Sequence, residues 1–294
     1  MLNVWTPMFP LDVAALAREL MSAHDSGEMV AIPPSSRPGF DLDAAYAVEA
    51  ILKNLREAAG HKAVGRKVGY ANKAMWRVLK LETLVWAHMY DDTVHYTGND
   101  IKNAQNSCTL SVAHPRSLKV EPEIFFGLKR SISSADPQKD AATAALESTA
   151  WIAVGFEIID CPYPDWKFQP SDFVASFGLH AALVVGHRVE IQPEQIATLV
   201  EELPRLKVRV SKNGEFVEEG SGKNSLKSPA LCLAELGAAI TRRSPTQPLQ
   251  AGEIVSSGTL TAGHLATAGE LWKVEVEGLS LSSLSLPPLT LRLA

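Results

Sequence analysis

The pattern of the sequence changes near residue 108, and this change constrains the fold more than any other feature does. Residues 12–27 and 41–60 have apolar side chains at helical spacing, with an aspartate before each run and a glycine at its end. After residue 108, short apolar or alternating runs bounded by proline, glycine and asparagine predominate, which is typical of strands. We therefore predict an α+β fold, in which a helical N-terminal part over residues 1–105 packs on a mixed-sheet domain over residues 106–294.

Four further elements are predicted in the second part of the chain. Residues 136–153 indicate one long helix, with Asp136 as its N-cap and proline at its first position, which leads directly into a strand. Residues 206–220 predict a hairpin around an Asn-Gly turn, and residues 228–243 predict another amphipathic helix. Residues 272–294 alternate apolar and polar side chains, so we expect one or two half-buried strands there.

Composition excludes several classes of function. The 294 residues include 28 Lys and Arg against 33 Asp and Glu, with no basic run, so a nucleic-acid partner is not expected. The three cysteines stand at wide spacings, which predicts reduced thiols in a cytoplasmic protein and no disulfide framework. Because no apolar stretch reaches the length of a membrane span and the first residues lack a signal-peptide pattern, we expect neither membrane insertion nor processing.

The apolar run 118–128 contains two carboxylates one residue apart. In an extended strand the side chains of Glu121 and Glu123 project to the same face, while Pro122 projects to the other. Proline removes a ladder hydrogen bond, so it belongs at a sheet edge, at a strand start or at a bulge. The spacing alone fits a solvated strand face. Burial would instead require a cation, because each unpaired buried charge costs roughly several kcal/mol.

A third carboxylate favours the cation. Glu157 is the only charged residue in the apolar run 151–159, which indicates a strand buried on both faces. An ionised glutamate there is unfavourable unless it is paired or bound to a metal. Three carboxylates with no His or Cys cluster make an oxygen-only site, which suits Mg²⁺ or Mn²⁺ and is poor for zinc.

Five short motifs occur in an order that resembles one enzyme family. They are GRKVG at 65–69, VEPEI at 120–124, GFEIIDCPYPDW at 155–166, GSGKNSLKSP at 220–229 and GEIVSSGTLT at 252–261. Together they resemble the 2-keto-4-pentenoate hydratase and 4-oxalocrotonate decarboxylase family of the fumarylacetoacetate hydrolase superfamily. The resemblance implies a mixed β-sheet roll with flanking helices, a homo-oligomer, and a divalent metal held by Glu121, Glu123 and Glu157.

The resemblance also implies roles for residues around this metal. Lys67 matches the family lysine that lies beside the substrate, where it adds positive charge or shuttles a proton, whereas the residues alone also allow a surface lysine. Apart from the resemblance, the glycines of these motifs let the backbone approach a ligand, so Gly258 and Thr259 are expected to bind the substrate, Thr259 by offering its N–H to a carboxylate; an ordinary turn is an equally good interpretation. A 2-oxo acid can chelate such a metal through its carboxylate and 2-oxo oxygens, and the cation then stabilises the developing enolate.

Two features depart from the family pattern. Where relatives carry a polar stretch that helps to position water, this chain has Ser-Phe-Gly-Leu-His from Ser176 to His180, and Val85 stands in place of an acidic residue. Ser176 remains a predicted substrate-binding residue. His180 and His88, the latter at the place of a family histidine, are predicted catalytic residues, and a purely structural histidine is an equally good interpretation of each.

These observations predict a divalent-metal-dependent lyase, of the hydratase or the decarboxylase type, whose small-molecule substrate is a 2-oxo acid. One alternative is a carbon-carbon bond hydrolase of an acylpyruvate, which needs a water-activating pair; His24 and Glu28 are the only candidates, and Gly27 interrupts their helix. Another alternative is a non-catalytic partner subunit of a related lyase. A larger or more apolar substrate is suggested by three tryptophans expected near the site, Trp76, Trp86 and Trp166.

Overall fold

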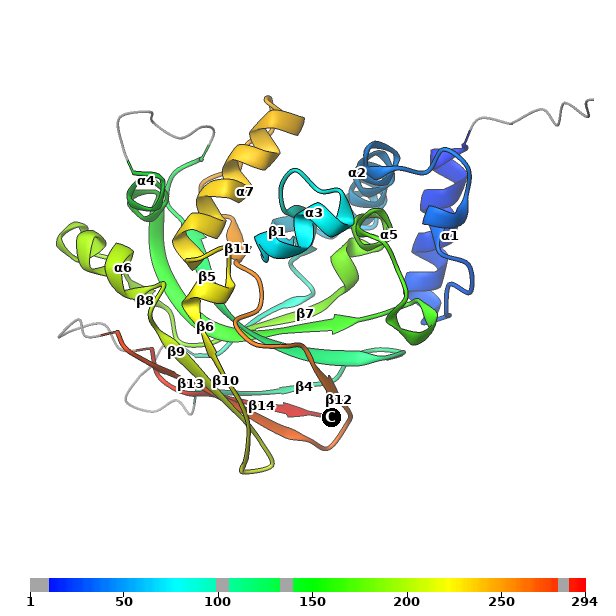
Figure 1. Ribbon diagram of the computed structural model, residues 1–294. Helices are drawn as coiled ribbons and strands as arrows, with labels where there is room; N and C mark the ends of the chain where they lie inside the picture. Colours follow the sequence, from blue (N-terminus) through cyan, green and yellow to red (C-terminus); the bar gives the residue numbers. More distant parts are fainter. Residues whose placement is uncertain (1–10, 99–105, 133–139, 280–285) are drawn as a thin grey trace, which may run out of the picture.

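The computed structural model describes residues 11–98, 106–132, 140–279 and 286–294. Two β-sheets lie one against the other, and the helices lie on the side of the larger sheet that faces away from the smaller one (Figure 1). Strands β13 (Leu271–Glu277) and β14 (Leu289–Leu293) of the smaller sheet contact β6 (Thr149–Asp160) of the larger one, so one hydrophobic core extends through both layers. The predicted α+β class is confirmed.

The larger sheet has the order β2-β1-β11-β5-β6-β7-β3, and two short strands, β12 and β8, pair with β5 and β6. Its strands are β1 (Ala63–Gly69), β2 (Val85–Tyr90), β3 (Val94–Tyr96), β5 (Leu118–Leu128), β6 (Thr149–Asp160), β7 (His180–Val185), β8 (Val189–Glu190), β11 (Ile254–Ser256) and β12 (His264–Ala266). The smaller sheet has the order β10-β9-β13-β14-β4. Its strands are β4 (Ser107–Leu110), β9 (Lys207–Lys212), β10 (Glu215–Ser221), β13 (Leu271–Glu277) and β14 (Leu289–Leu293).

The helices follow the sequence signals closely at their ends. They are α1 (Val13–Ser26), α2 (Leu42–Ala58), α3 (Lys73–Leu79), α4 (Ala141–Glu147), α5 (Pro170–Ala175), α6 (Ile196–Glu202) and α7 (Pro229–Arg243). The side chains of Asp12 and Asp41 cap α1 and α2 by accepting from backbone N–H groups three residues on, and Gly27 ends α1 in the left-handed conformation. The predicted helices over 12–27, 41–60 and 228–243 are therefore confirmed.

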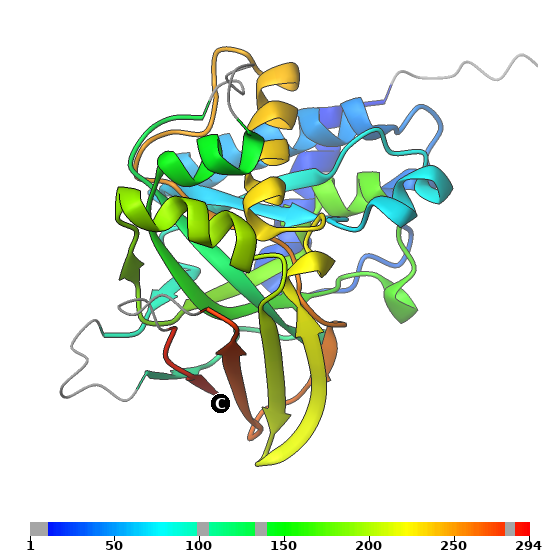
Figure 2. The ribbon, with the colours of Figure 1, turned by 60° about the vertical axis from the view of Figure 1, so that its left-hand side comes forward.

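The predicted hairpin is also confirmed. Strands β9 and β10 pair antiparallel, and Asn213 and Gly214 have φ values of 53° and 88° at the turn. This hairpin projects at the lower edge of the view in Figure 2. The C-terminal alternation forms β13 and β14, which pair with each other, while residues 280–285 lie outside the described part.

Two expectations about secondary structure were wrong. Residues 63–96, in the part expected to be helical, supply β1, β2 and β3 to the larger sheet. This sheet therefore contains strands from both sides of residue 105. The division of the chain into two parts at residue 105 stays a prediction. The long helix over 136–153 is reduced to α4, capped by Asp140, because Trp151 and Ile152 pair in β6 with β5 on one side and β8 on the other. Asp136 lies outside the described residues.

Pro122 lies in the middle of β5 at a point where one side of the strand has no partner strand. On that side β12 pairs with residues 118–120 and β11 with residues 125–127. The carbonyl of Pro122 accepts from the N–H of Leu260, at 2.9 Å, in the connection between those two strands. Because the N–H and C=O of a residue in an antiparallel ladder point to the same side, the missing N–H of Pro122 also faces this gap. Pro122 thus lies where no strand pairs with this side of β5 and where the connection 257–263 crosses it.

Two further observations concern the cysteines and the helices. All three cysteines are free thiols, and Cys161 and Cys232 are buried. None of the helices in the described part of the chain combines the length and the apolar character that a membrane crossing requires.

Candidate active site

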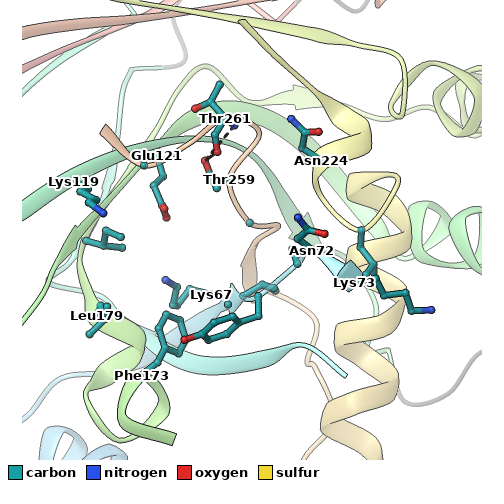
Figure 3. A pocket seen from close by; sticks show the side chains of 18 of the residues that line it. Lys67, Asn72, Lys73, Lys119, Glu121, Phe173, Leu179, Asn224, Thr259 and Thr261 are labelled. Atoms are coloured by element: carbon teal, nitrogen blue, oxygen red, sulfur yellow. Dashed lines mark hydrogen bonds between the residues drawn. The ribbon is translucent and has the colours of Figure 1, made fainter. Parts of the chain in front are cut away.

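A pocket of about 790 Å³ lies where the connection 257–263 passes β5 and β1. Figure 3 shows Lys67 and Glu121 pointing toward each other across it, with Thr259 and Asn224 on other walls. Its lining residues come from β1, β5, α3, α5 and the turn before α7. They include Lys67, Tyr70, Asn72, Lys119, Glu121, Ile159, Trp166, Phe168, Phe173, Leu179, Asn224, Gly258 and Thr259.

The three predicted glutamates meet behind one wall of this pocket. Glu121 is the register partner of Glu157 across β5 and β6, and Glu123 follows on the same face of β5. One carboxylate oxygen from each lies within 4.8 Å of the others. Glu123 and Glu157 are fully buried, whereas Glu121 is partly exposed and lines the pocket. The cluster therefore reaches the pocket through Glu121.

One oxygen of Glu123 is satisfied and the other is not. Its Oε2 accepts from the Ser256 hydroxyl and, at 2.9 Å, from the Gly258 N–H. Its Oε1 is buried and has no hydrogen-bond partner among the described residues. A buried carboxylate oxygen without a partner, beside two further carboxylates, is the environment that a cation stabilises. These hard oxygen donors fit Mg²⁺ or Mn²⁺.

Glu157 is held by two cationic or hydrogen-bonding groups. The Lys67 Nζ lies 3.0 Å from its Oε1, and the His180 Nδ1 lies 3.0 Å from the same oxygen. Lys67 also donates to the Gly178 carbonyl at 2.9 Å and lies over the Phe173 ring, while the His180 Nε2 contacts the Thr93 hydroxyl at 3.1 Å. His180 is therefore behind the carboxylates and does not line the pocket.

The electrostatics separate the three carboxylates. Burial, together with the negative charges of the other two glutamates, raises the pKa of Glu123 well above its usual range. Burial raises the pKa of Glu121 to about 7. Burial also acts to raise the pKa of Glu157, but Lys67 and His180 outweigh it and lower that pKa. Without a cation the cluster thus holds one stabilised carboxylate and two that resist ionisation.

The loop 176–179 positions Lys67 through backbone strain. Phe177, Gly178 and Leu179 have φ values of 53°, 62° and 57°, all in the left-handed region. Any Cβ at Gly178 would lie 2.5 Å from the Lys67 Cδ. The Ser176 hydroxyl is 2.5 Å from the Tyr163 hydroxyl, and Ser176 does not line the pocket. The structure therefore gives Ser176 a place away from the predicted substrate contact.

Gly258 and Thr259 both line the pocket, but their polar groups are partly committed. The Gly258 N–H donates to Glu123, and the φ of 86° at Gly258 favours glycine at this turn. The Thr259 hydroxyl donates to the Thr261 carbonyl at 3.0 Å. Gly258 thus orients the carboxylate cluster from the pocket side.

His88 is not part of this site. His88 in β2 pairs across the sheet with Arg66 in β1. Because Arg66 directly precedes Lys67, its side chain, and with it that of His88, lies on the face of the sheet opposite to Lys67. The His88 Nδ1 makes a short contact to the buried Glu49 of α2, and His88 does not line the pocket. Burial lowers the pKa of His88. The structure thus places His88 in a buried pair beneath α2, away from the pocket.

The proposed hydrolase pair and two of the three tryptophans also lie elsewhere. His24 packs on Phe177 with ring centroids 4.4 Å apart, and α1 ends between His24 and Glu28. Of the tryptophans, Trp166 lines the pocket, whereas the buried Trp76 and Trp86 do not.

Sequence reasoning missed Lys119, a pocket-lining residue two positions before Glu121. The alternation of side chains in a strand could have found it, because residues 119, 121 and 123 share one face. Phe173 and Leu179 were missed for another reason: no local signal joins α5 and the 176–179 loop to β1.

Comparisons with known proteins agree with the fold and the family resemblance. No family model matches the sequence. The chain is 26% identical over 267 residues to a 2-keto-4-pentenoate hydratase of Burkholderia vietnamiensis, covering 91% of this chain and 94% of the relative. It is 29% identical over 279 residues to a 4-oxalocrotonate decarboxylase of a Pseudomonas species, covering 94% of this chain and 98% of the relative.

Solved structures show the same fold. A 4-oxalocrotonate decarboxylase from Pseudomonas putida G7, complexed with magnesium and adipate, superposes with a TM-score of 0.80 at 23% identity, over 96% of this chain and 97% of that one. A fumarylpyruvate hydrolase from Pseudomonas aeruginosa, complexed with Mn²⁺ and pyruvate, gives a TM-score of 0.52 at 15% identity, over 79% of this chain and 89% of that one. The predicted fold of the fumarylacetoacetate hydrolase type is confirmed.

Proposed function

Because the chain is a homologue of the 2-keto-4-pentenoate hydratases and 4-oxalocrotonate decarboxylases, we propose that it is a divalent-metal-dependent lyase acting on a 2-oxo acid. The observation that supports this most directly is the buried Glu123 Oε1 without a described partner, beside Glu121 and Glu157. The three glutamates are the proposed ligands of Mg²⁺ or Mn²⁺. When bound, such a cation supplies electrostatic stabilisation of an enolate formed from the 2-oxo acid.

The residues of the chain have separate tasks in this proposal. Lys67, at the pocket wall, presents its ammonium to the substrate and can hold or return a proton there. His180 orients Glu157 and Lys67 through the shared carboxylate oxygen, so it is a positioning residue. Gly258 fixes Glu123 through its N–H. The fit of all these groups to one pocket favours an enzyme over a non-catalytic partner subunit.

The experiment uses the purified chain with Mg²⁺ or Mn²⁺ and with chelator. Exchange of the C3 protons of 2-oxobutanoate in D₂O, followed by NMR, reports enolate formation without any assumption about the natural substrate. Exchange that requires the metal and disappears in Glu123→Gln is the expected result. Metal-independent exchange, or none at all, would contradict the proposed chemistry.

A second assay identifies the bond that changes. Release of carbon dioxide from 4-oxalocrotonate indicates decarboxylation, whereas water addition to 2-hydroxypenta-2,4-dienoate indicates hydration. Release of pyruvate from an acylpyruvate would indicate the hydrolase alternative. We also propose a homo-oligomer in the cytoplasm, and light scattering on the purified protein tests its oligomeric state.

A further inference from the structure

Lys119 presents its ammonium to the pocket. It lies on the same face of β5 as Glu121 and lines the pocket with it (Figure 3). Lys67 is paired with Glu157 at 3.0 Å, but no ion pair joins Lys119 to a carboxylate among the residues that the structure describes. Instead, the Lys119 Nζ lies 3.8 Å from the centroid of the Trp166 ring. An aromatic face holds a cation without cancelling its charge.

Trp166 is itself held firmly. Its Nε1 donates to the Ser117 hydroxyl at 2.8 Å, and the Ser117 N–H donates to the buried Asp160 carboxylate at 2.8 Å. Asp165 and Trp166 have φ values of 53° and 57°, in the left-handed region. This region is unfavourable for residues other than glycine, so the surrounding contacts must impose this turn. Strain of this kind is concentrated at functional sites.

The charges of the site leave a role for this ammonium. A divalent cation held by the three glutamates would, together with Lys67, balance their three negative charges. A bound 2-oxo acid adds one negative charge. Of the further lysines that line the pocket, Lys73, Lys223 and Lys227 come from α3 and the turn before α7, whereas Lys119 lies on the strand that carries Glu121 and Glu123. In a partly buried pocket an anion without a counter-charge is unfavourable, because the surroundings screen it less than water does.

We propose that Lys119, held on the indole ring of Trp166, binds a carboxylate of the substrate. This inference rests on the proposed function. The carboxylate is either that of the 2-oxo acid itself or a second one farther along the substrate, and a pocket of about 790 Å³ has room for either. The two sources are separated by the choice of ligand.

Isothermal titration of the Mg²⁺-loaded protein with pyruvate and with 2-oxoadipate tests the proposal. Lys119→Met removes the charge and keeps much of the chain length, so we expect binding to weaken about 10- to 100-fold, the effect of losing one hydrogen bond to a charged group. Lys119→Arg should restore most of it. The matched control is Lys212→Met, because Lys212 also lies over a tryptophan, Trp272, at 5.4 Å, but outside the pocket.

The outcomes are distinct. Weakened binding of both ligands assigns Lys119 to the 2-oxo acid carboxylate, and weakened binding of 2-oxoadipate alone assigns it to a second carboxylate. Unchanged binding of both ligands by Lys119→Met overturns the proposal. A separate titration with Mn²⁺ distinguishes failure of the Lys119 proposal from failure of the proposed function. The proposed function requires that the wild type bind both Mn²⁺ and pyruvate. The Lys119 proposal requires in addition that Lys119→Met still bind Mn²⁺.

Discussion

Replacing Glu123 by Gln should have opposite effects on the protein with and without metal. In the metal-free protein, the glutamine oxygen can keep the bonds from Ser256 and Gly258, while its NH₂ group takes the place of the unpartnered Oε1. That NH₂ group is a donor beside two carboxylates, where the wild type places a third carboxylate. We therefore expect Glu123→Gln to be more stable than the wild type when both are free of metal.

The size of this effect follows from the geometry. Two unit charges 4.8 Å apart repel by about 3 kcal/mol at an effective dielectric constant of about 20. Because the pKa of Glu123 is already raised, protonation relieves part of this repulsion at pH 7. The expected gain in the free energy of unfolding is about 1 to 3 kcal/mol, or roughly 2 to 6 °C in Tm.

Thermal unfolding with chelator and with excess Mg²⁺ measures both effects. Mg²⁺ should raise the Tm of the wild type by mass action and leave that of Glu123→Gln nearly unchanged. The matched control is Glu49→Gln, which removes another buried carboxylate, but one whose pKa is lowered through its pairing with His88. This variant should lose about 1 to 3 kcal/mol at any Mg²⁺ concentration.

One pattern of results would refute the reasoning. If Glu123→Gln is destabilised without metal as much as Glu49→Gln, the carboxylate of Glu123 is not a repulsive element of the cluster. If its Tm still rises with Mg²⁺ as in the wild type, Glu123 is not a ligand.

Three further predictions concern the surroundings of the site. Lys67→Met should retain Mn²⁺ binding in a calorimetric titration but lose at least about 100-fold in turnover, and an active variant would remove Lys67 from the mechanism. Gly178→Ala should lower turnover about 10-fold and the free energy of unfolding by about 1 to 2 kcal/mol, because the new Cβ meets Lys67. The control Gly214→Ala also has a positive φ, of 88°, but nothing lies within 4 Å of its Cβ, so it should lose stability and keep its activity. Equal activities of the two variants would contradict this reasoning. Burial lowers the pKa of His24 from 6.5 to about 4, so between these pH values His24 is protonated in the unfolded state and neutral in the folded state. The free energy of unfolding should therefore fall by roughly 2 to 3 kcal/mol between pH 6.5 and pH 4, as measured by urea titrations. In His24→Leu this fall should be smaller.

The sequence determined the parts of this protein whose signals are local. Helices α1 and α2 begin at the capping aspartates and end close to the glycines that predict their ends, because a cap is a contact between residues three or four positions apart. The same holds for the Asn213-Gly214 turn, whose backbone conformation few other residues adopt. The glutamates of β5 share a face because side chains in a strand alternate, and this required no knowledge of the fold.

Only the tertiary structure decided what these residues meet. The pairing of β5 with β6 places Glu121 opposite Glu157, and the 176–179 loop supplies the carbonyl that holds Lys67. No periodicity encodes these contacts, because they join segments far apart in the chain. The assignment of residues 149–153 to a strand has the same cause, since pairing with β5 outweighs local helix propensity. The partners of basic side chains are decided in the same way: in the sequence His88 and Lys119 are both isolated basic residues, yet packing buries His88 against Glu49 and leaves Lys119 facing the pocket.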